Sequence, residues 1–276
     1  MSRADELFIQ NCADILKNGA SDATNCVRAH WSDGAPATTL RRFGVVNRYD
    51  LSREFPILTL RRVPLAKAID ELLWIWQKKS NNIRDLNSHI WDSWADETGG
   101  IGKAYGYQLG IKHAYPEGEF DQVDRLLYDI SHNPNSRRMI TNMYNHSDLN
   151  EMNLYPCAYG VTVTVTDGRL NLLLNQRSQD MLVANGWNTA QYAALAHMLA
   201  RVSGYAVGEF LHVIADAHIY DRHIPLVEEL IARDPYPAPK FSLAEGVTDF
   251  YAFMPEHFKL EGYRAHPFRH EIPVAI

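Results

Sequence analysis

Cysteine is scarce in this sequence. The 276 residues contain three, Cys12, Cys26 and Cys157, and no two of them have the CxxC spacing. An odd number without that spacing predicts neither a disulfide framework nor a zinc knuckle, so at least one thiol is free. Because a single free cysteine is most often a small buried hydrophobic residue, each of the three needs further support before it is assigned chemistry.

The sequence also lacks long apolar stretches and long runs of one charge. No segment approaches the roughly 18 to 20 uninterrupted apolar residues of a membrane span, and the first residues lack the apolar core of a signal peptide. With 27 basic and 33 acidic residues the net charge is −6. No basic run predicts a surface for duplex nucleic acid, although one local basic pocket can still hold a small anion. We therefore expect a cytoplasmic protein with no nucleic-acid or membrane partner.

What is present is an ordinary globular composition, with 46% apolar and 22% charged residues. No internal repeat, low-complexity tract or long linker divides the chain, which predicts a single domain over residues 1–276. Hydrophobic periodicity predicts helices and strands without regular strand–helix–strand alternation, so the expected fold class is α+β with a mainly antiparallel or mixed sheet. The predicted helices cover residues 4–18, 64–76, 121–131 and 189–203, and a further strand covers 207–214.

A β-hairpin is the clearest local prediction. Valines at 161, 163 and 165 alternate with threonines, and Asp167-Gly168 then turns the chain into a second strand with leucines at 170, 172 and 174. The register of a two-residue turn places Cys157 opposite Ser178 and beside Arg177. A neighbouring cation lowers the pKa of a thiol, so Cys157 is a candidate nucleophile, with a buried structural cysteine as the alternative.

Three further features suggest chemistry, each with a plainer alternative. Arg137-Arg138 follow an Asn-Pro turn and are a candidate clamp for an anion such as phosphate, or simply a solvated surface pair. Glu71 has apolar neighbours on its predicted helix, so burial is expected to raise its pKa toward general-base chemistry; otherwise it pairs with Lys67 on the surface. Asn188 offers a donor and an acceptor to a heterocycle, or caps the helix that begins at 189.

Two other patterns do not support a site. The glycines within Thr98–Ala104 have neither the GxxxxGK[ST] nor the GxGxxG spacing, so no phosphate loop is predicted there. His218 and His223 are five residues apart, which does not suit one helix face, and no metal site is predicted for them with Asp216.

Many ordered segments, from the first helix to the last residue, together resemble the thymidylate synthase family, the folate-dependent C5 methyltransferases of deoxyuridylate. Single residues that match are Asp180, Asn188, Asp216, His218 and Tyr220. The matching segments are Phe55-Pro56-Ile57-Leu58-Thr59, Glu71-Leu72-Leu73-Trp74, Ile90-Trp91-Asp92-Ser93-Trp94-Ala95-Asp96-Glu97, Tyr105-Gly106, Asn135-Ser136-Arg137-Arg138, Pro156-Cys157, Gln176-Arg177-Ser178 and Pro273-Val274-Ala275-Ile276.

The resemblance implies a homodimer formed through the sheet, and a reaction in which Cys157 adds to C6 of dUMP before C5 attacks 5,10-methylenetetrahydrofolate. By the same resemblance, Glu71 and Tyr105 manage proton transfers and Asn188 recognises the uracil edge. The substrate-binding residues implied are Arg28, Gln176, Arg177, Ser178, His218 and Tyr220, with Arg137 and Arg138 of the partner subunit on the phosphate. The folate-binding residues implied are Trp91, Asp180, Ala184 and the carboxylate of Ile276.

The chain departs from the family pattern at several positions. Residues 27–36 replace the usual Arg-Thr-Gly-Thr-Gly loop, Ala158 replaces a common histidine, and Ile214-Ala215 replace a Gly-Gly pair. Residues 184–188, Ala-Asn-Gly-Trp-Asn, replace the usual Gly-Leu-Pro-Phe-Asn. The Cβ of Ala184 and the indole of Trp187 are expected to displace the folate or admit water. Water in place of hydride would give a hydroxymethyl product, so a dUMP hydroxymethylase is the alternative.

Two other readings are less favoured. Hydride transfer is favoured over water because the chain retains Trp91, Trp94 and the terminal Val-Ala-Ile. A uracil substrate is favoured over cytosine because the chain has Asn188 where the deoxycytidylate enzymes usually have Asp. A catalytically silent nucleotide-binding or translational-control protein is opposed by the intact set of Glu71, Tyr105, Cys157, Arg177 and Asn188.

Overall fold

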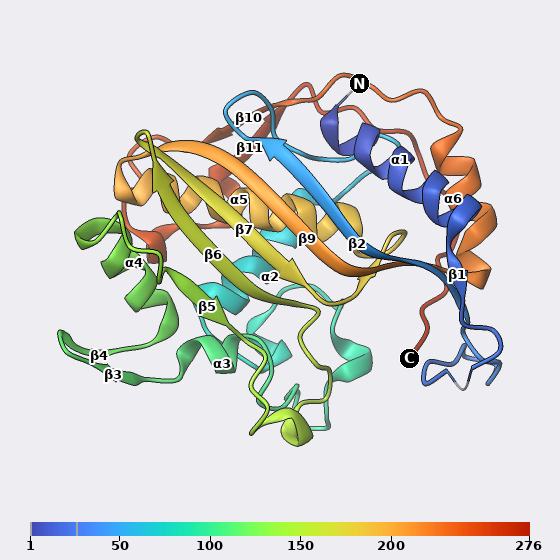
Figure 1. The fold of residues 1–276 in the computed structure, drawn as a ribbon, viewed down its shortest axis with the longest axis horizontal. Coiled ribbons are helices and arrows are strands. Elements are labelled where there is room, and N and C mark those ends of the chain that lie inside the picture. The colour runs from blue at the N-terminus through green and yellow to red at the C-terminus, as the bar shows by residue number, and fades with distance from the viewer. Residues whose placement is uncertain (1, 26) are drawn as a thin grey trace.

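A mixed β-sheet forms the centre of the computed structural model, which describes residues 2–25 and 27–276, so that Cys26 lies outside the described part. Its strands follow the order β1-β2-β9-β7-β6-β5, with β8 also pairing with β9 (Figure 1). β9 runs parallel to β7 and β8 and antiparallel to β2, which confirms the predicted α+β class. The strands of this sheet are β1 (Ala20–Ser21), β2 (Thr39–Asp50), β5 (Ile140–Asn142), β6 (Ala158–Thr166), β7 (Arg169–Gln176), β8 (Gln179–Asp180) and β9 (Ala206–Tyr220).

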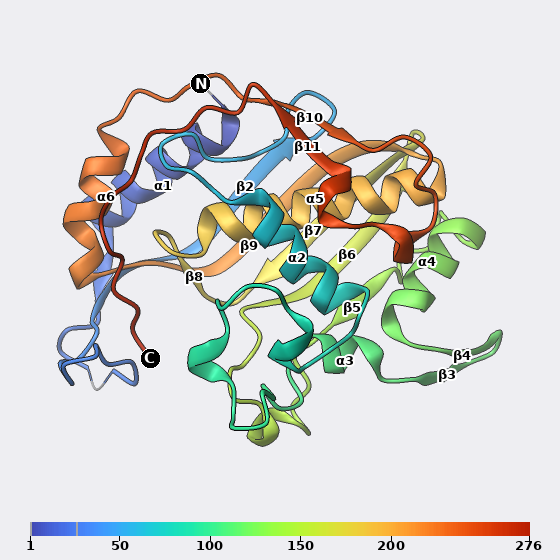
Figure 2. The same cartoon turned by 180° about the vertical axis from the view of Figure 1, so that it is seen from behind.

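Helices cover one face of the sheet in two layers (Figure 2). α5 (Asn185–Ser203) packs directly on β7 and β9, and α2 (Leu65–Trp76) packs on α5. The remaining helices are α1 (Arg3–Asn18), α3 (Gly106–Gly110), α4 (Gln122–His132) and α6 (Ile224–Ile231), with 3-10 turns at Ile83–Asp85, Asp92–Trp94, Leu149–Glu151, Asp221–His223, Phe250–Ala252 and Pro255–His257. Two small hairpins complete the fold: β3 (His113–Tyr115) with β4 (Gly118–Phe120), and β10 (Lys240–Leu243) with β11 (Phe258–Glu261). Among the described residues, no helix combines the length and apolarity that crossing a membrane requires.

The four predicted helices are confirmed, but α5 begins four residues earlier than expected. Asn188 therefore lies inside the helix, where its backbone N–H donates to the carbonyl of Ala184. The prediction that Asn188 caps the helix is wrong, because the side chain is not needed there and points instead toward other polar groups. The helix ends, as expected, at Gly204, which has a φ of 75°.

The β6–β7 hairpin has the predicted register only as far as Gly160. From Thr166 opposite Arg169 to Gly160 opposite Asn175 the pairing is regular, but Ala158 then faces Gln176 because Tyr159 is an extra residue in a β-bulge. The backbone N–H of Arg177 donates to the carbonyl of Cys157, at 2.9 Å. Cys157 thus lies opposite Arg177 and not opposite Ser178, so the bulge brings the predicted thiol and cation directly together.

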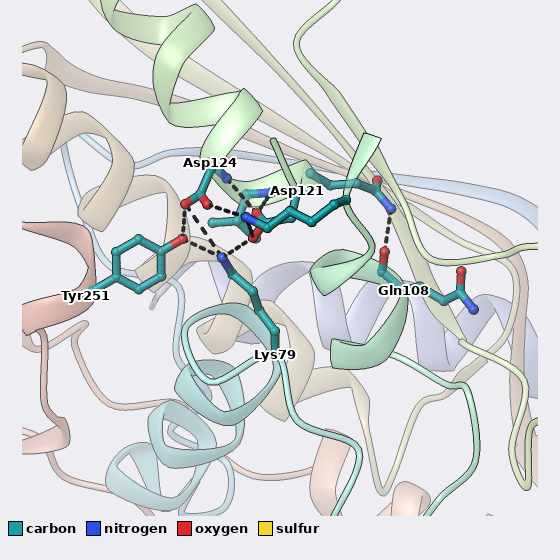
Figure 3. A network of polar contacts seen from close by, with 8 residues as sticks. Lys79, Gln108, Asp121, Asp124 and Tyr251 are labelled. Carbon is teal, nitrogen blue, oxygen red and sulfur yellow. Dashed lines mark hydrogen bonds and ion pairs between the residues drawn. The ribbon is translucent and has the colours of Figure 1, made fainter. Parts of the chain in front are cut away.

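A polar network ties the C-terminal end of α2 to the beginning of α4 (Figure 3). The ammonium of Lys79 lies 2.6 Å from a carboxylate oxygen of Asp121 and 2.7 Å from the hydroxyl of Tyr251, which itself donates to Asp124. Asp121 also caps α4, since its side chain accepts from the N–H groups of residues 123 and 124. The network joins the segment that follows α2 to the beginning of α4 and to Tyr251.

Candidate active site

An apolar cavity of about 420 Å³ lies between α2, α5 and the segment from Ile90 to Tyr105. It brings together six of the predicted site residues: Glu71, Trp91, Tyr105, Cys157, Ala184 and Asn188. Ile272 and Val274, from the C-terminal segment, form part of its wall. A predominantly aromatic and aliphatic lining with a few polar groups is typical of a site for a flat organic ligand.

Cys157 lies at the entrance to β6, directly after Pro156. Its Sγ is 3.6 Å from Nη2 of Arg177, whose guanidinium is held by the carbonyls of Tyr155 at 2.8 Å and Pro156 at 3.0 Å. Burial raises the pKa of the Cys157 thiol, while the positive charges of Arg177 and Arg28 and a hydrogen bond with Tyr105 oppose that shift. Arg177 acts to lower the thiol pKa, as predicted. In the free protein burial has the larger effect, so the thiol pKa is raised and the prediction of a net lowered pKa is wrong.

Tyr105 holds the nucleophile from the opposite side. Its hydroxyl accepts a hydrogen bond from the backbone N–H of Cys157, at 3.0 Å, and its ring packs edge-on against Trp91. The backbone of Tyr105 has a φ of 45°, a conformation that non-glycine residues rarely adopt. Burial and the adjacent Cys157 raise the pKa of Tyr105 well above its usual value, so the phenol is a proton donor at neutral pH. The strained backbone is therefore part of how the phenol is positioned.

Glu71 is buried, with 7% of the residue exposed, and its carboxylate receives three N–H donors. Nε1 of Trp91 donates to Oε1, while Nε1 of Trp187 and Nε2 of Gln191 donate to Oε2, each at 2.5 Å. Burial raises the pKa of Glu71 even though these three hydrogen bonds act in the other direction. The expected raised pKa is confirmed, and the alternative of a surface pair with Lys67 is wrong.

A second, polar cavity of about 390 Å³ contains five further predicted residues: Arg28, Arg177, Ser178, His218 and Tyr220. It meets the first cavity at the contact between Arg177 and Cys157. Asp216 accepts a hydrogen bond from Nδ1 of His218 at 3.0 Å, which fixes the imidazole. Guanidinium, hydroxyl and imidazole groups around one cavity suit a sugar phosphate.

Arg41 is a member of the polar cavity that the sequence did not reveal. It lies on β2 directly opposite His218 on β9, and its Nη1 is 3.3 Å from Asp216. Only the pairing of two strands that are far apart in the sequence brings it there, so no local pattern signals it.

Comparisons with known proteins agree with this geometry. The family model described as thymidylate synthase matches residues 6–276. A thymidylate synthase of Bacillus subtilis subsp. natto is 45% identical over 269 residues, covering 96% of both chains, and that of Bacillus phage phi3T is 44% identical over the same shares. The solved structure of the thermostable thymidylate synthase A from Bacillus subtilis superimposes with a TM-score of 0.94 and 42% identity over 99% of each chain. The chain belongs to the thymidylate synthase family.

The predicted resemblance to the thymidylate synthase family is thus confirmed, and the chain is a methyltransferase of that family. Among the described residues, five of the substrate- and folate-binding residues that the resemblance implies line neither cavity. Arg137 and Arg138 are exposed between α4 and β5. Gln176 is buried behind Asn188, to which its Nε2 donates at 3.1 Å.

Asp180 and Ile276, the other two, are held by neighbouring backbone. Asp180 accepts from the N–H groups of residues 182 and 183. Although burial alone would raise the pKa of Asp180, its hydrogen bond with His223 and the charge of His223 hold it below its usual value. Ile276 pairs with His30 through two backbone hydrogen bonds, so the C-terminal segment is already docked over the site.

Proposed function

We propose that the chain converts dUMP to dTMP with 5,10-methylenetetrahydrofolate as the one-carbon donor. The observation that carries the proposal is the junction of the two cavities, where the Cys157 thiol lies 3.6 Å from the Arg177 guanidinium. On one side of this contact the lining is apolar and aromatic; on the other it contains two further arginines, a serine, a histidine and a tyrosine. A nucleotide that spans the junction places its phosphate among the cations and its base over the thiol.

In this mechanism Cys157 is the nucleophile. Its sulfur bonds to C6 of uracil, the electrons of the C5=C6 double bond move toward C5 and O4, and C5 becomes able to attack an electrophilic carbon. Arg177 stabilises the thiolate before addition and so opposes, without cancelling, the effect of burial that raises the thiol pKa in the free protein. When the S–C6 bond breaks after transfer, the electrons return to the sulfur and the double bond re-forms.

Glu71 and Tyr105 move the protons. The carboxylate of Glu71, fixed by three donors and raised in pKa by burial, accepts and returns a proton at the O4 side of the base. The Tyr105 hydroxyl, which accepts from the backbone N–H of Cys157 and stays protonated because its pKa is raised, takes part with Glu71 in proton transfers through ordered water. In the polar cavity, Arg28, Arg177 and Ser178 bind the phosphate, while His218 and Tyr220 bind the 3′-hydroxyl.

The apolar cavity fits a reduced folate. Trp91, Trp94 and Trp187 offer flat surfaces to a pterin ring, and the volume of about 420 Å³ accommodates it beside the base. When bound, the folate supplies the one-carbon unit and the hydride that completes the methyl group. The Ile276 carboxylate acts at the edge of this cavity, since the docked C-terminal segment contributes Ile272 and Val274 to its wall. Asp180 is assigned to the folate by the family resemblance alone.

The protein acts as a homodimer in this proposal, with Arg137 and Arg138 completing the phosphate site of the other subunit. The sheet face opposite α5 supports it, because Leu173 on β7 and Leu211 and Val213 on β9 are apolar there and only partly buried. Phe43 on β2 is 92% exposed. An apolar sheet face of this kind is typical of an interface between subunits.

We expect two inactive variants to restore one another. Cys157→Ser lacks the nucleophile and Arg137→Ala/Arg138→Ala lacks the clamp, so a mixed dimer has one complete site, and random reassortment of subunits returns about a quarter of wild-type activity. The assay is the rate of dTMP formation after mild dissociation and reassociation. The control is a triple variant that carries all three changes; mixed with either inactive variant, it should restore no activity. Mixed dimers that form, as shown by differently tagged subunits, without any recovery would contradict a shared site.

The product itself tests the reaction. After incubation with dUMP and 5,10-methylenetetrahydrofolate, mass spectrometry should show a hydrogen of the base replaced by methyl, with near-ultraviolet absorbance reporting one dihydrofolate per product. A hydroxymethyl gain with tetrahydrofolate left unoxidised would overturn the proposal and establish the hydroxymethylase. Cys157→Ser provides the blank for both readouts.

A further inference from the structure

Given the proposed function, we infer that Gln191 is a positioning residue for base selection. It fixes the side-chain amide of Asn188 in the one orientation that accepts uracil and rejects cytosine. Gln191 lies one turn after Trp187 on α5 and is buried, with 3% of the residue exposed. The orientation of each side-chain amide follows from hydrogen-bond partners that can act only as acceptors.

Gln191 is anchored by two acceptors. Its Nε2 donates to the backbone carbonyl of Ala68 at 3.0 Å and to the Glu71 carboxylate at 2.5 Å. A backbone carbonyl and an ionised carboxylate can only accept, so both hydrogens of the Gln191 amide are used there. The Oε1 of Gln191 therefore faces Asn188 as an acceptor, and Nδ2 of Asn188 donates to it at 3.1 Å.

Gln176 fixes the same amide from the other side. Its Nε2 donates to the backbone carbonyl of Ser178 at 3.0 Å, which sets its orientation, and then to Oδ1 of Asn188 at 3.1 Å. Its Oε1 accepts from Nε2 of His212 at 2.7 Å. Burial lowers the pKa of His212 to about 3, so the ring is neutral and carries its single proton on this nitrogen.

The consequence for Asn188 is one free donor and one free acceptor in fixed positions. Each of its polar atoms has one inward hydrogen bond, which leaves one hydrogen on Nδ2 and one lone pair on Oδ1 for a ligand. Uracil offers the matching edge, an acceptor at O4 and a donor at N3. Cytosine offers the reverse, a donor at N4 and an acceptor at N3, and needs the amide turned over.

Turning the Asn188 amide over is blocked at both ends. A flipped amide sets Nδ2 against Nε2 of Gln176 and Oδ1 against Oε1 of Gln191, a donor facing a donor and an acceptor facing an acceptor. Neither glutamine can follow, because Ser178, Ala68 and Glu71 hold them. Asn188 alone can hydrogen-bond either base, so the selectivity comes from the two glutamines that hold it.

The test is Gln191→Met, which keeps the length of the side chain and removes its amide. The dissociation constants of dUMP and dCMP are measured by calorimetry for wild type and variant, without folate. We expect the preference for dUMP over dCMP to fall by about tenfold or more, mainly because dCMP binds more tightly once the amide can turn. An unchanged ratio in a folded Gln191→Met protein would overturn the inference.

Gln108→Met is the matched control. Gln108, labelled in Figure 3, is equally buried, at 2%, and lines neither cavity. Its Nε2 donates to the backbone carbonyl of Lys103 and to the carboxylate of Asp148. Gln108→Met should lose stability but keep the wild-type ratio. If Gln191→Met does not fold, Gln191→Leu removes the same amide and is measured in its place; an unchanged ratio in folded Gln191→Leu overturns the inference.

The outcomes separate this inference from the proposed function. Wild-type protein that binds neither nucleotide would contradict the proposed substrate, whatever the variants do. Wild-type protein that prefers dUMP, together with variants that prefer it to the same degree, would leave the proposed function standing and refute the role of Gln191.

Discussion

Replacing Cys157 with Ser is expected to lower kcat by about four orders of magnitude or more, while dUMP should continue to bind. The hydroxyl cannot reach its anionic form at neutral pH beside a single guanidinium, so addition to C6 stops. The phosphate and base contacts proposed above come from other side chains, so this variant should keep them. Initial rates from the near-ultraviolet absorbance change and the dUMP dissociation constant from calorimetry measure the two quantities separately.

Cys12→Ser is the control for the loss of a thiol. Cys12 is fully buried in α1 and lines neither cavity, so its replacement should cost about 1 kcal/mol of stability and leave kcat within a factor of two. Cys157→Ser protein with more than a tenth of wild-type kcat would show that another group performs the addition. Loss of activity in both variants alike would point to unfolding and not to chemistry.

Replacing Glu71 with Gln is expected to lower kcat by about two to four orders of magnitude, the usual contribution of a general acid–base group. The amide keeps the size of the carboxyl group but cannot take up a proton, and it turns a donor toward one of the N–H groups that now donate to Glu71. The KM for dUMP should change far less, because Glu71 is absent from the polar cavity.

The pH profile distinguishes this role from a structural one. Because burial raises the pKa of Glu71, the protonated form persists above the usual pH range of a glutamate, and the rate should climb as pH rises through that pKa. Glu71→Gln removes this climb. Asp70→Asn is the control: Asp70 is also buried on α2 and bonds to Asn87 outside the cavities, and because its charge helps to raise the pKa of Glu71, its replacement should keep the climb and move it to lower pH. A Glu71→Gln profile with the wild-type acid limb would assign that limb to another group.

The sequence predicts the main elements of the fold because their patterns are local. The alternation of valine and threonine before Asp167-Gly168 specifies β6 and its turn, and the apolar stripe after Pro64 specifies α2. The bulge at Tyr159 is not predicted, because the alternation of apolar and polar residues along β6 does not show which residue is the extra one. The early start of α5 was missed because residues 184–188 contain no capping side chain that hydrogen-bonds the first turn.

Some contacts of the site follow from the local sequence, and others do not. Cys157 beside Arg177 follows from the hairpin, and the raised pKa of Glu71 follows from its helix neighbours. The Trp187 and Gln191 bonds to Glu71 depend on how α5 crosses α2, and Arg41 depends on the pairing of β2 with β9. These are tertiary contacts, which no spacing within one segment encodes.

The indole of Trp187, which lines the apolar cavity, points its N–H at Glu71. Together with Trp91, it places two of the six tryptophans in direct hydrogen bonds to one carboxylate. The excited state of an indole responds to a charge on its hydrogen-bond partner. We therefore expect the emission wavelength and yield of these two tryptophans to change when Glu71 takes up a proton, so that tryptophan fluorescence followed against pH reports that proton before any ligand is added.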